Sequence, residues 1–438
     1  MVSSEINYNF ELPYPNCSDF EIEDDLLSSR RRIMRLMDDD RVWQIIRQKF
    51  GSDFFECEDI VTCRYVDEDD FCRQNNEAIP HLNVFSMNIR SLIKHMGELS
   101  CLLQVLGNDF DIIILSEIGS RNLSLAQNLF PNHEFYFKPP KRNYFGGVAV
   151  YINKNMTEVR VLSNLEITMN CNCVKCEVES LFLQFKHFKY PYIIGAIYRH
   201  PNGSIEHFVE ALERSLGSIT SNISTIIAGD INIDLIQTER TDVSNYVSLM
   251  LSNKFMPNIT LPTRITSHSA TCIDHMFIRN LHKVTTRGIF SGILYCDISD
   301  HLPCILSIKY DQRSMRQEDR PYVRLYGTRN NNTFIESMRS VYWNGLYTAE
   351  IDWYAAYMHK VTPIYNNSFP LVKLSRKRAK DKPWITTGLK RSTQENNKLY
   401  KISIRKGDYA SKAAYNSYKR IYRRCLKQAE TNYYNDIF

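Results

Sequence analysis

From about residue 81 onward, short apolar runs rich in β-branched residues alternate with stretches whose apolar residues have helical spacing. The runs predict strands at 81–89, 111–117, 146–152, 192–199, 225–232, 272–278 and 302–308. The stretches 92–106 and 208–216 predict amphipathic helices. Strands interleaved with helices indicate an α/β fold built in layers, and argue against an all-β sandwich.

The chain of 438 residues has room for two or three domains. Residues 1–80 predict an acidic N-terminal region of unknown role, partly disordered, with one short amphipathic helix around 33–46. Residues 81–310 are expected to form the α/β domain. Residues 311–381 predict a linker with weak helices, and residues 382–438 a basic helical connector.

Charge is distributed unevenly along the chain, although the formal net charge is only +5. Residues 1–80 carry 9 Lys and Arg against 19 Asp and Glu, whereas residues 371–438 carry 18 against 5. A basic tail after a near-neutral body favours contact with a polyanion such as nucleic acid. The alternative is a solvated helix face that binds nothing.

No apolar run is long enough to cross a bilayer, and the acidic N-terminus has no apolar segment of a secretory signal. The twelve cysteines show no framework spacing, which fits reduced thiols. Cys171, Cys173 and Cys176 have no second ligand pair nearby, which argues against a zinc site. We therefore expect a nuclear or cytoplasmic protein that is not secreted and has no membrane partner.

Polar residues recur at the ends of the predicted strands: Asn88, Glu117, Tyr198, Asp230, Asn232, Asp274, Asp300 and His301. Carboxylates and amides at strand ends can converge on one rim of a sheet, where α/β folds tend to bind ligands. Oxygen ligands suit a hard cation, so the pattern favours Mg²⁺, with Mn²⁺ as an alternative, over zinc. His275 is expected to be structural, because its neighbour Asp274 has His301 as its expected partner.

In this order, these residues resemble the endonuclease/exonuclease/phosphatase superfamily, which includes abasic-site endonucleases and pancreatic deoxyribonuclease. The sharpest motifs are AGDINID at 228–234 and ISDHLPCIL at 298–306. The resemblance spans about 81–310. It implies a four-layer α/β/β/α sandwich, with two packed mixed sheets flanked by helices, and here a helical C-terminal tail follows.

A narrower resemblance is to the endonuclease domains of jockey-type non-LTR retrotransposons, carried by FGGVAVYI at 145–152, YRHP at 198–201 and PTRITSHSATCIDHMFI at 262–278. The segment KPWITTGLKRSTQENNKLYK at 382–401 resembles the connector that leads such polyproteins into a reverse transcriptase. Asp-Asp pairs occur only at 24–25, 38–40 and 69–70. The chain is therefore expected to lack a reverse transcriptase active site, as a polyprotein truncated before that domain would.

The resemblance implies a role for each matching residue in metal binding and proton transfer. Glu117 would bind the metal, helped by Asn88 and Asp300. His301 would take a proton from the attacking water, and Asp274 would hold its imidazole in the required tautomer.

The remaining matches concern the water and the substrate phosphate. Asp230 and Asn232 would align the water and contact the phosphate. Tyr198 would hydrogen-bond the phosphoryl oxygens, and Thr263 would also contact the phosphate.

The implied activity is that of a Mg²⁺-dependent phosphodiesterase. The leading hypothesis is a DNA endonuclease that nicks one strand and leaves a 3′-hydroxyl, as in target-primed retrotransposition. DNA is then the expected partner, and RNA is a further candidate ligand of the basic tail. Two alternatives stay open: another phosphodiesterase or phosphatase of the superfamily, and a non-catalytic, domesticated copy that binds nucleic acid.

Overall fold

The computed structural model describes residues 24–50, 61–75, 81–107, 110–119, 122–141, 145–169, 177–187, 190–279, 288–309, 322–324, 326–343, 353–373 and 382–435. A seven-stranded sheet contains β1 (Cys63–Val66), β2 (His81–Asn88), β3 (Ile112–Ser116), β4 (His133–Lys138), β5 (Val148–Asn153), β14 (Ile289–Leu294) and β15 (Cys304–Lys309). Its strand order is β1-β14-β15-β2-β3-β5-β4. β1 pairs with β14, and β2 with β3, in parallel, so this sheet is mixed.

A six-stranded sheet contains β6 (Thr157–Val161), β7 (Val178–His187), β8 (Tyr190–Arg199), β9 (Ser224–Asp230), β10 (Met256–Pro257) and β13 (Asp274–Arg279). Its order is β10-β13-β9-β8-β7-β6, and only β8 and β9 run parallel. A separate two-stranded sheet joins β11 (Arg264–Ile265) to β12 (Ala270–Thr271). Short 3-10 helices are η3 (Leu123–Ala126), η4 (Ser163–Leu165) and η5 (Leu235–Gln237).

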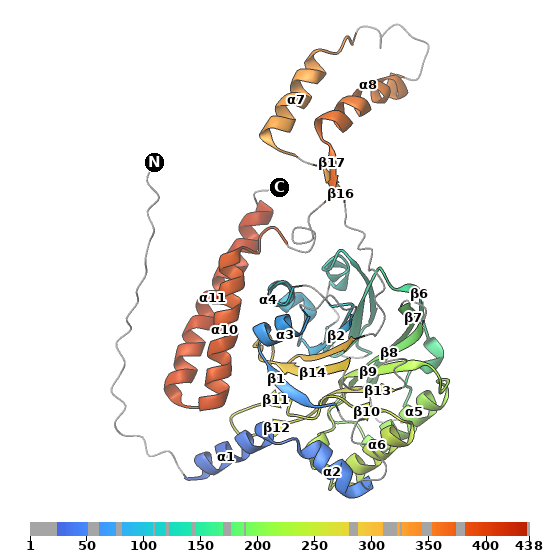
Figure 1. Cartoon of the computed structure of the whole chain (residues 1–438), viewed down its shortest axis with the longest axis vertical. Coiled ribbons are helices and arrows are strands. Elements are labelled where there is room, and N and C mark those ends of the chain that lie inside the picture. Colours follow the sequence, from blue (N-terminus) through green and yellow to red (C-terminus); the bar gives the residue numbers. More distant parts are fainter. Residues whose placement is uncertain are drawn as a thin grey trace.

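The two large sheets pack face to face, and helices cover their outer faces (Figure 1). Val84 from the first sheet and Ile194 from the second belong to the same buried core. α4 (Leu92–Val105) packs on the other face of the first sheet, where Leu103 belongs to a second core with Phe85. α5 (Ile205–Gly217) and α6 (Thr241–Ser252) cover the second sheet. The predicted four-layer α/β/β/α sandwich is confirmed.

Each predicted strand overlaps an observed one, with ends that differ by at most two residues. In the two large sheets the sequence patterns missed the short strands β1 and β10, and also β4, β6, β7 and β14. β4 and β6 are edge strands with exposed residues, so their sequences lack the apolar runs of the central strands. β7 buries the polar residues Glu179 and Ser180, and β14 contains Gly292, which weaken the same signal.

The N-terminal helix expected around 33–46 is two helices, α1 (Asp24–Asp38) and α2 (Arg41–Phe50). The break lies at Asp40, whose carboxylate accepts a hydrogen bond from the backbone N–H of Trp43 at 3.3 Å and caps α2. Thr260 Oγ1 donates to the same carboxylate at 2.7 Å. Trp43 lies in the core between the sheets, so this part of the acidic region packs onto the 81–310 body. α3 (Glu68–Asn75) follows β1.

The C-terminal tail is helical, as expected. α10 (Thr387–Lys406) and α11 (Tyr409–Asn435) form a hairpin whose turn contains Gly407 at a φ of 67°. The hairpin lies along α4 (Figure 1), and Trp384 and Leu426 pack against Cys101 of that helix. Along the chain, the body and the hairpin are separated by α7 (Thr328–Arg339), α8 (Trp353–Ser368) and the paired strands β16 (Tyr322–Arg324) and β17 (Leu371–Lys373).

Across the described segments, we find no helix with the length and apolar character needed to span a bilayer.

Candidate active site

Strands of both sheets bring polar side chains to one end of the sandwich. Asp230 at the end of β9 is directly opposite Asp274 at the start of the antiparallel β13. Asn88, which ends β2 in the other sheet, donates from Nδ2 to Asp230 Oδ2 at 2.8 Å and so connects the two sheets. Gly229 has a φ of +142°, and a Cβ there would lie 1.9 Å from the carbonyl oxygen of Ile197. Glycine is therefore required for the close approach of β8 beside Asp230.

Asp274 and His301 form a buried pair, with His301 Nδ1 2.8 Å from Asp274 Oδ2. Thr263 Oγ1 donates to the same carboxylate oxygen at 2.6 Å and accepts the backbone N–H of Asp274 at 3.1 Å. These bonds fix the carboxylate and leave Nε2 of His301 as the nitrogen that does not face Asp274. One ligand atom each from Asp230, Asp274 and His301 lie within 4.8 Å of one another.

Thr263, which the resemblance expects to contact the phosphate, lies against the Asp274 carboxylate in this structure. Its side chain is fully buried, and its hydroxyl proton is used on Asp274. From there its hydroxyl can keep the Asp274 carboxylate oriented toward His301.

A second group lies around Arg90, which the sequence patterns did not single out. Its guanidinium lies 3.0 Å from Asp300 Oδ1 (Nη1) and 3.9 Å from Glu117 Oε2 (Nε). Arg264 Nε donates to the other oxygen of Asp300 at 2.8 Å. Tyr198 Oη donates to Glu117 Oε1 at 3.1 Å. The structure thus brings Glu117, Asp300 and Tyr198 together through direct contacts or through Arg90.

Asn232 occupies a left-handed conformation with a φ of 52° just after β9. Its backbone N–H donates to Asp230 Oδ1 at 3.1 Å, and its Nδ2 donates to the carbonyl of Arg199 at 2.8 Å. The buried guanidinium of Arg199 donates in return to the carbonyls of Ile231 and Asn232, each at 2.7 Å. Arg199 is therefore a structural residue that holds the Asp230–Asn232 turn in place.

The electrostatics of the site favour a cation. Burial acts to lower the pKa of His301, but the carboxylates of Asp274, Asp230 and Asp300 outweigh it and raise this pKa to about 9. Burial, together with the neighbouring Asp274, raises the pKa of Asp230. Glu117 and Asp300 add two further carboxylates, beside the guanidinium groups of Arg90 and Arg264. Asp274 Oδ1 is buried without a hydrogen-bond partner among the described residues. Carboxylate and amide oxygens gathered in this way fit a divalent ion such as Mg²⁺ or Mn²⁺.

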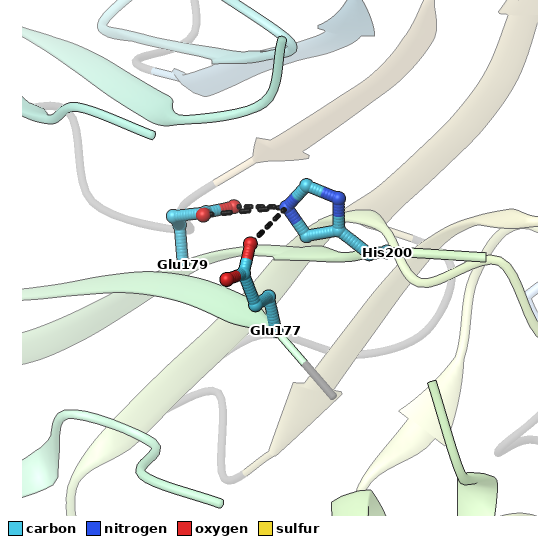
Figure 2. A group of neighbouring side chains, drawn as sticks. All are labelled: Glu177, Glu179 and His200. Carbon is cyan, nitrogen blue, oxygen red and sulfur yellow. Dashed lines mark hydrogen bonds and ion pairs between the residues drawn. The ribbon is translucent and has the colours of Figure 1, made fainter. Parts of the chain in front are cut away.

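A further group of metal-ligating side chains, the Glu177–Glu179–His200 group, lies nearby (Figure 2). His200 Nε2 lies 3.1 Å from Glu179 Oε2 and 4.0 Å from Glu177 Oε2. Burial acts to lower the pKa of His200, but Glu179, Glu177 and Glu117 outweigh it and raise this pKa. A Cβ on Gly146, whose φ is +107°, would lie 3.1 Å from His200 Nε2, so glycine leaves room for this group.

The sequence patterns did not predict the Glu177–Glu179–His200 group, although Glu177 and Glu179 stand two residues apart, as side chains on one face of a strand do. In the β7–β8 register Val178 pairs with Arg199, which places Glu177 beside His200. The ring of His200 also packs edge-on against Tyr198, with centroids 4.8 Å apart. The group therefore borders the candidate active site. Cys171, Cys173 and Cys176 lie outside the described residues.

Comparisons with known proteins agree with this architecture. A model of the endonuclease/exonuclease/phosphatase family matches residues 82–301, half of the chain. Similar solved structures include the endonuclease domain of TRAS1, a telomere-specific non-LTR retrotransposon, with 13% identity over 53% of this chain and 100% of that domain and a TM-score of 0.42. The AP endonuclease LMAP from Leishmania major has 11% identity over 66% of this chain and 99% of its own, with a TM-score of 0.44.

The AP endonuclease from Archaeoglobus fulgidus has 14% identity over 53% of this chain and 100% of its own, with a TM-score of 0.38. A comparison with curated proteins gave no match. The family match starts at the second residue of β2, covers every later strand through β14 and ends at His301. The chain belongs to the endonuclease/exonuclease/phosphatase family, as its strand-end motifs predicted.

Proposed function

We propose that this chain is a metal-dependent DNA endonuclease that hydrolyses a phosphodiester in one strand and leaves a 3′-hydroxyl. The single observation that supports this best is the buried Asp274–His301 pair beside Asp230, at 2.8 Å between His301 Nδ1 and Asp274 Oδ2. A base positioned by a carboxylate, next to further carboxylates that can hold a cation, suits attack of water on an anionic phosphodiester.

In this proposal His301 Nε2 accepts a proton from the attacking water. Asp274 holds the imidazole so that Nδ1 carries its hydrogen, and it stabilises the imidazolium that forms. Thr263 keeps the Asp274 carboxylate in place through its 2.6 Å hydrogen bond. Proton transfer to a positioned base of this kind typically contributes a factor of about 10²–10⁴ to the rate.

Glu117, Asn88 and Asp300 would hold the metal. A bound divalent cation would neutralise the carboxylates and polarise the phosphate, and its charge would act against the carboxylates that raise the pKa of His301. Mg²⁺ is the ion that we propose, and Mn²⁺ suits the same oxygen donors.

Asp230 and Asn232 would align the water and contact the phosphate, and Tyr198 would donate to the phosphoryl oxygens. Arg90 and Arg264, which pair with Asp300 at 3.0 and 2.8 Å, add positive charge beside the place where the phosphate would lie. The substrate we propose is duplex DNA, cut as in target-primed retrotransposition by an element of the jockey type. The basic tail is the part of the chain that we propose for further contact with nucleic acid, RNA included.

A nicking assay tests the proposal. Purified protein is incubated with supercoiled plasmid in Mg²⁺, in Mn²⁺ or in EDTA, and the relaxed product is then offered to a DNA polymerase that extends only 3′-hydroxyl ends. We expect relaxed, extendable product with either metal and none in EDTA. Release of inorganic phosphate from monoesters without plasmid nicking would favour a phosphatase of the same family. Binding without any hydrolysis would favour a non-catalytic copy.

A further inference from the structure

Several side chains of the C-terminal hairpin meet at Asp297, in the segment that leads into Asp300 and His301. Asp297 is 5% exposed. Its Oδ2 accepts a hydrogen bond from Asn396 Nδ2 at 2.9 Å, and its Oδ1 lies 2.5 Å from Lys419 Nζ. Arg423 Nη2 lies 3.8 Å from Oδ1. A buried carboxylate needs such partners, because losing one of them leaves its charge uncompensated.

Arg423 connects this segment to a second element of the site. Its Nε lies 2.5 Å from Glu98 Oε1 on α4, while its Nη2 is directed at Asp297. α4 begins at Leu92, shortly after Asn88 leaves β2. The hairpin therefore holds both the segment that follows Asn88 and the segment that precedes His301.

Asp297 is also close along the chain to the residues of the site. Two residues beyond Asp297, Ser299 Oγ donates to the carbonyl of Asn88 at 2.6 Å and accepts the backbone N–H of His301 at 3.1 Å. A displacement of Asp297 would move Ser299 and His301 with it. On the other side of Asp297, Arg405 Nε donates to Tyr295 Oη at 2.9 Å, so the hairpin holds this segment at two points.

We propose that the C-terminal hairpin is a working part of the hydrolytic site, in which Asp297, Lys419 and Arg423 are positioning residues that hold the 297–301 segment against Asp274 and Asp230. The expected change in rate rests on the proposed function, whereas the contact between the hairpin and the 297–301 segment does not. A misplacement of a reacting group by about 1 Å costs a factor on the order of 10² in rate, so loosening this segment should slow hydrolysis. A hairpin that only adds stability would leave the rate per folded molecule unchanged.

Two matched variants of the full chain separate these possibilities. Asp297→Asn removes the charge that faces Lys419. Asp67→Asn removes the charge of another Lys–Asp pair between body and hairpin, at 3.1 Å from Lys401 Nζ, which does not touch the 297–301 segment. We expect Asp297→Asn to lower the single-turnover nicking rate at saturating protein by about tenfold with little change in half-saturating concentration. Asp67→Asn should stay within about twofold of wild type. Equal rates for the two variants, after correction for the folded fraction, would overturn the proposal.

Lys419 provides a second route if Asp297→Asn does not fold. Lys419→Met should slow nicking, and Lys419→Arg should restore it, because arginine can renew the ion pair with Asp297. An equally slow Lys419→Arg would contradict the role of the ion pair.

A readout without catalysis keeps this test separate from the proposed function. In protein labelled with ¹⁵N-histidine, the imidazole signals of His301 are identified by their loss in His301→Gln. We expect Asp297→Asn to shift or broaden these signals and Asp67→Asn to leave them unchanged. If the wild type does not nick DNA but the signals respond in this way, the proposed function fails while the positioning contact stands. Unchanged signals in Asp297→Asn would overturn the contact itself.

Discussion

His275 and His301 each follow an aspartate in the sequence, but His275 contacts neutral polar groups whereas His301 lies beside carboxylates. His275 is fully buried, with Nε2 2.8 Å from the carbonyl of Ile233 and Nδ1 3.0 Å from Tyr246 Oη. Burial lowers its pKa to about 4, so it is neutral and structural. His301 faces three carboxylates, which raise its pKa. Two Asp-His pairs that look alike in sequence thus support different chemistry.

This difference gives a matched pair of variants. His301→Gln keeps the volume and a donor toward Asp274 but removes the base, so plasmid nicking should fall by about 10²–10⁴-fold while the melting temperature stays near that of wild type. His275→Gln should do the reverse, lowering the melting temperature with little effect on the rate per folded molecule. Nicking by His301→Gln at the wild-type rate would show that another group is the base.

Part of the site was predictable from sequence at the level of single residues. Asp230, Asp274 and His301 stand in short motifs at strand ends, and the structure brings one ligand atom of each to within 4.8 Å of the others. Arg90, Arg264 and the Glu179–His200 pair were not predictable, because their proximity depends on cross-strand register and on the packing of the two sheets. The metal-binding and catalytic roles of all these residues stay predictions.

At the scale of elements, α11 presents two faces with different charge environments. Lys419 and Arg423 face the body and pair with Asp297 and Glu98. Exposed basic residues follow one another at helical spacing on the outside: Lys412, Arg420, Arg424 and Lys427. The residues from Tyr409 to Ala429 include no Asp or Glu. Only the outer group is available to a polyanion without breaking the hairpin away from the body.

We therefore expect the outer face to carry the salt-sensitive part of DNA binding. Changing Lys412, Arg420, Arg424 and Lys427 to Gln should weaken affinity for duplex DNA. Each lost phosphate contact should also reduce the log–log salt slope by roughly 0.9. Fluorescence anisotropy at several salt concentrations measures both quantities. The control removes the same number of charges, from the exposed Arg31, Arg32 and Arg35 of α1 and Arg47 of α2. Equal losses in the two sets would assign the effect to net charge alone.

Element types followed from sequence wherever burial made the pattern strong. Central strands such as β3 and β9 are buried along their whole length, so their apolar runs are unmistakable. The edge strand β6 is largely exposed and reads as a polar loop. The break between α1 and α2 depends on Thr260, far along the chain, which contacts Asp40. No local pattern can contain such a contact.

At the scale of the whole molecule, the acidic and basic ends of the chain meet on the α/β body. Arg405 Nη1 lies 2.5 Å from Asp38 Oδ1, and Lys401 Nζ lies 3.1 Å from Asp67 Oδ2. Asn397 donates to Glu68 at 2.6 Å, and burial, only partly offset by this bond, raises the pKa of Glu68 to about 7. The opposite charges of the two ends were visible in the sequence, but their contact was not. The sequence therefore suggested two separate appendages where the described residues form a shared surface.

The parallel pairing of β1 with β14 has a practical consequence for anyone who shortens this protein. A chain that starts at residue 81, one residue before the family match begins, would leave open the edge of β14 that β1 covers, although β15 still pairs with its other edge. An open edge of this kind recruits strands from other molecules. We expect such a truncation to form concentration-dependent aggregates, visible by light scattering, while a chain that starts at residue 24 stays monodisperse. A monodisperse truncation would show that β14 needs no cover. By covering this edge of β14, the four residues Cys63–Val66 would prevent self-association.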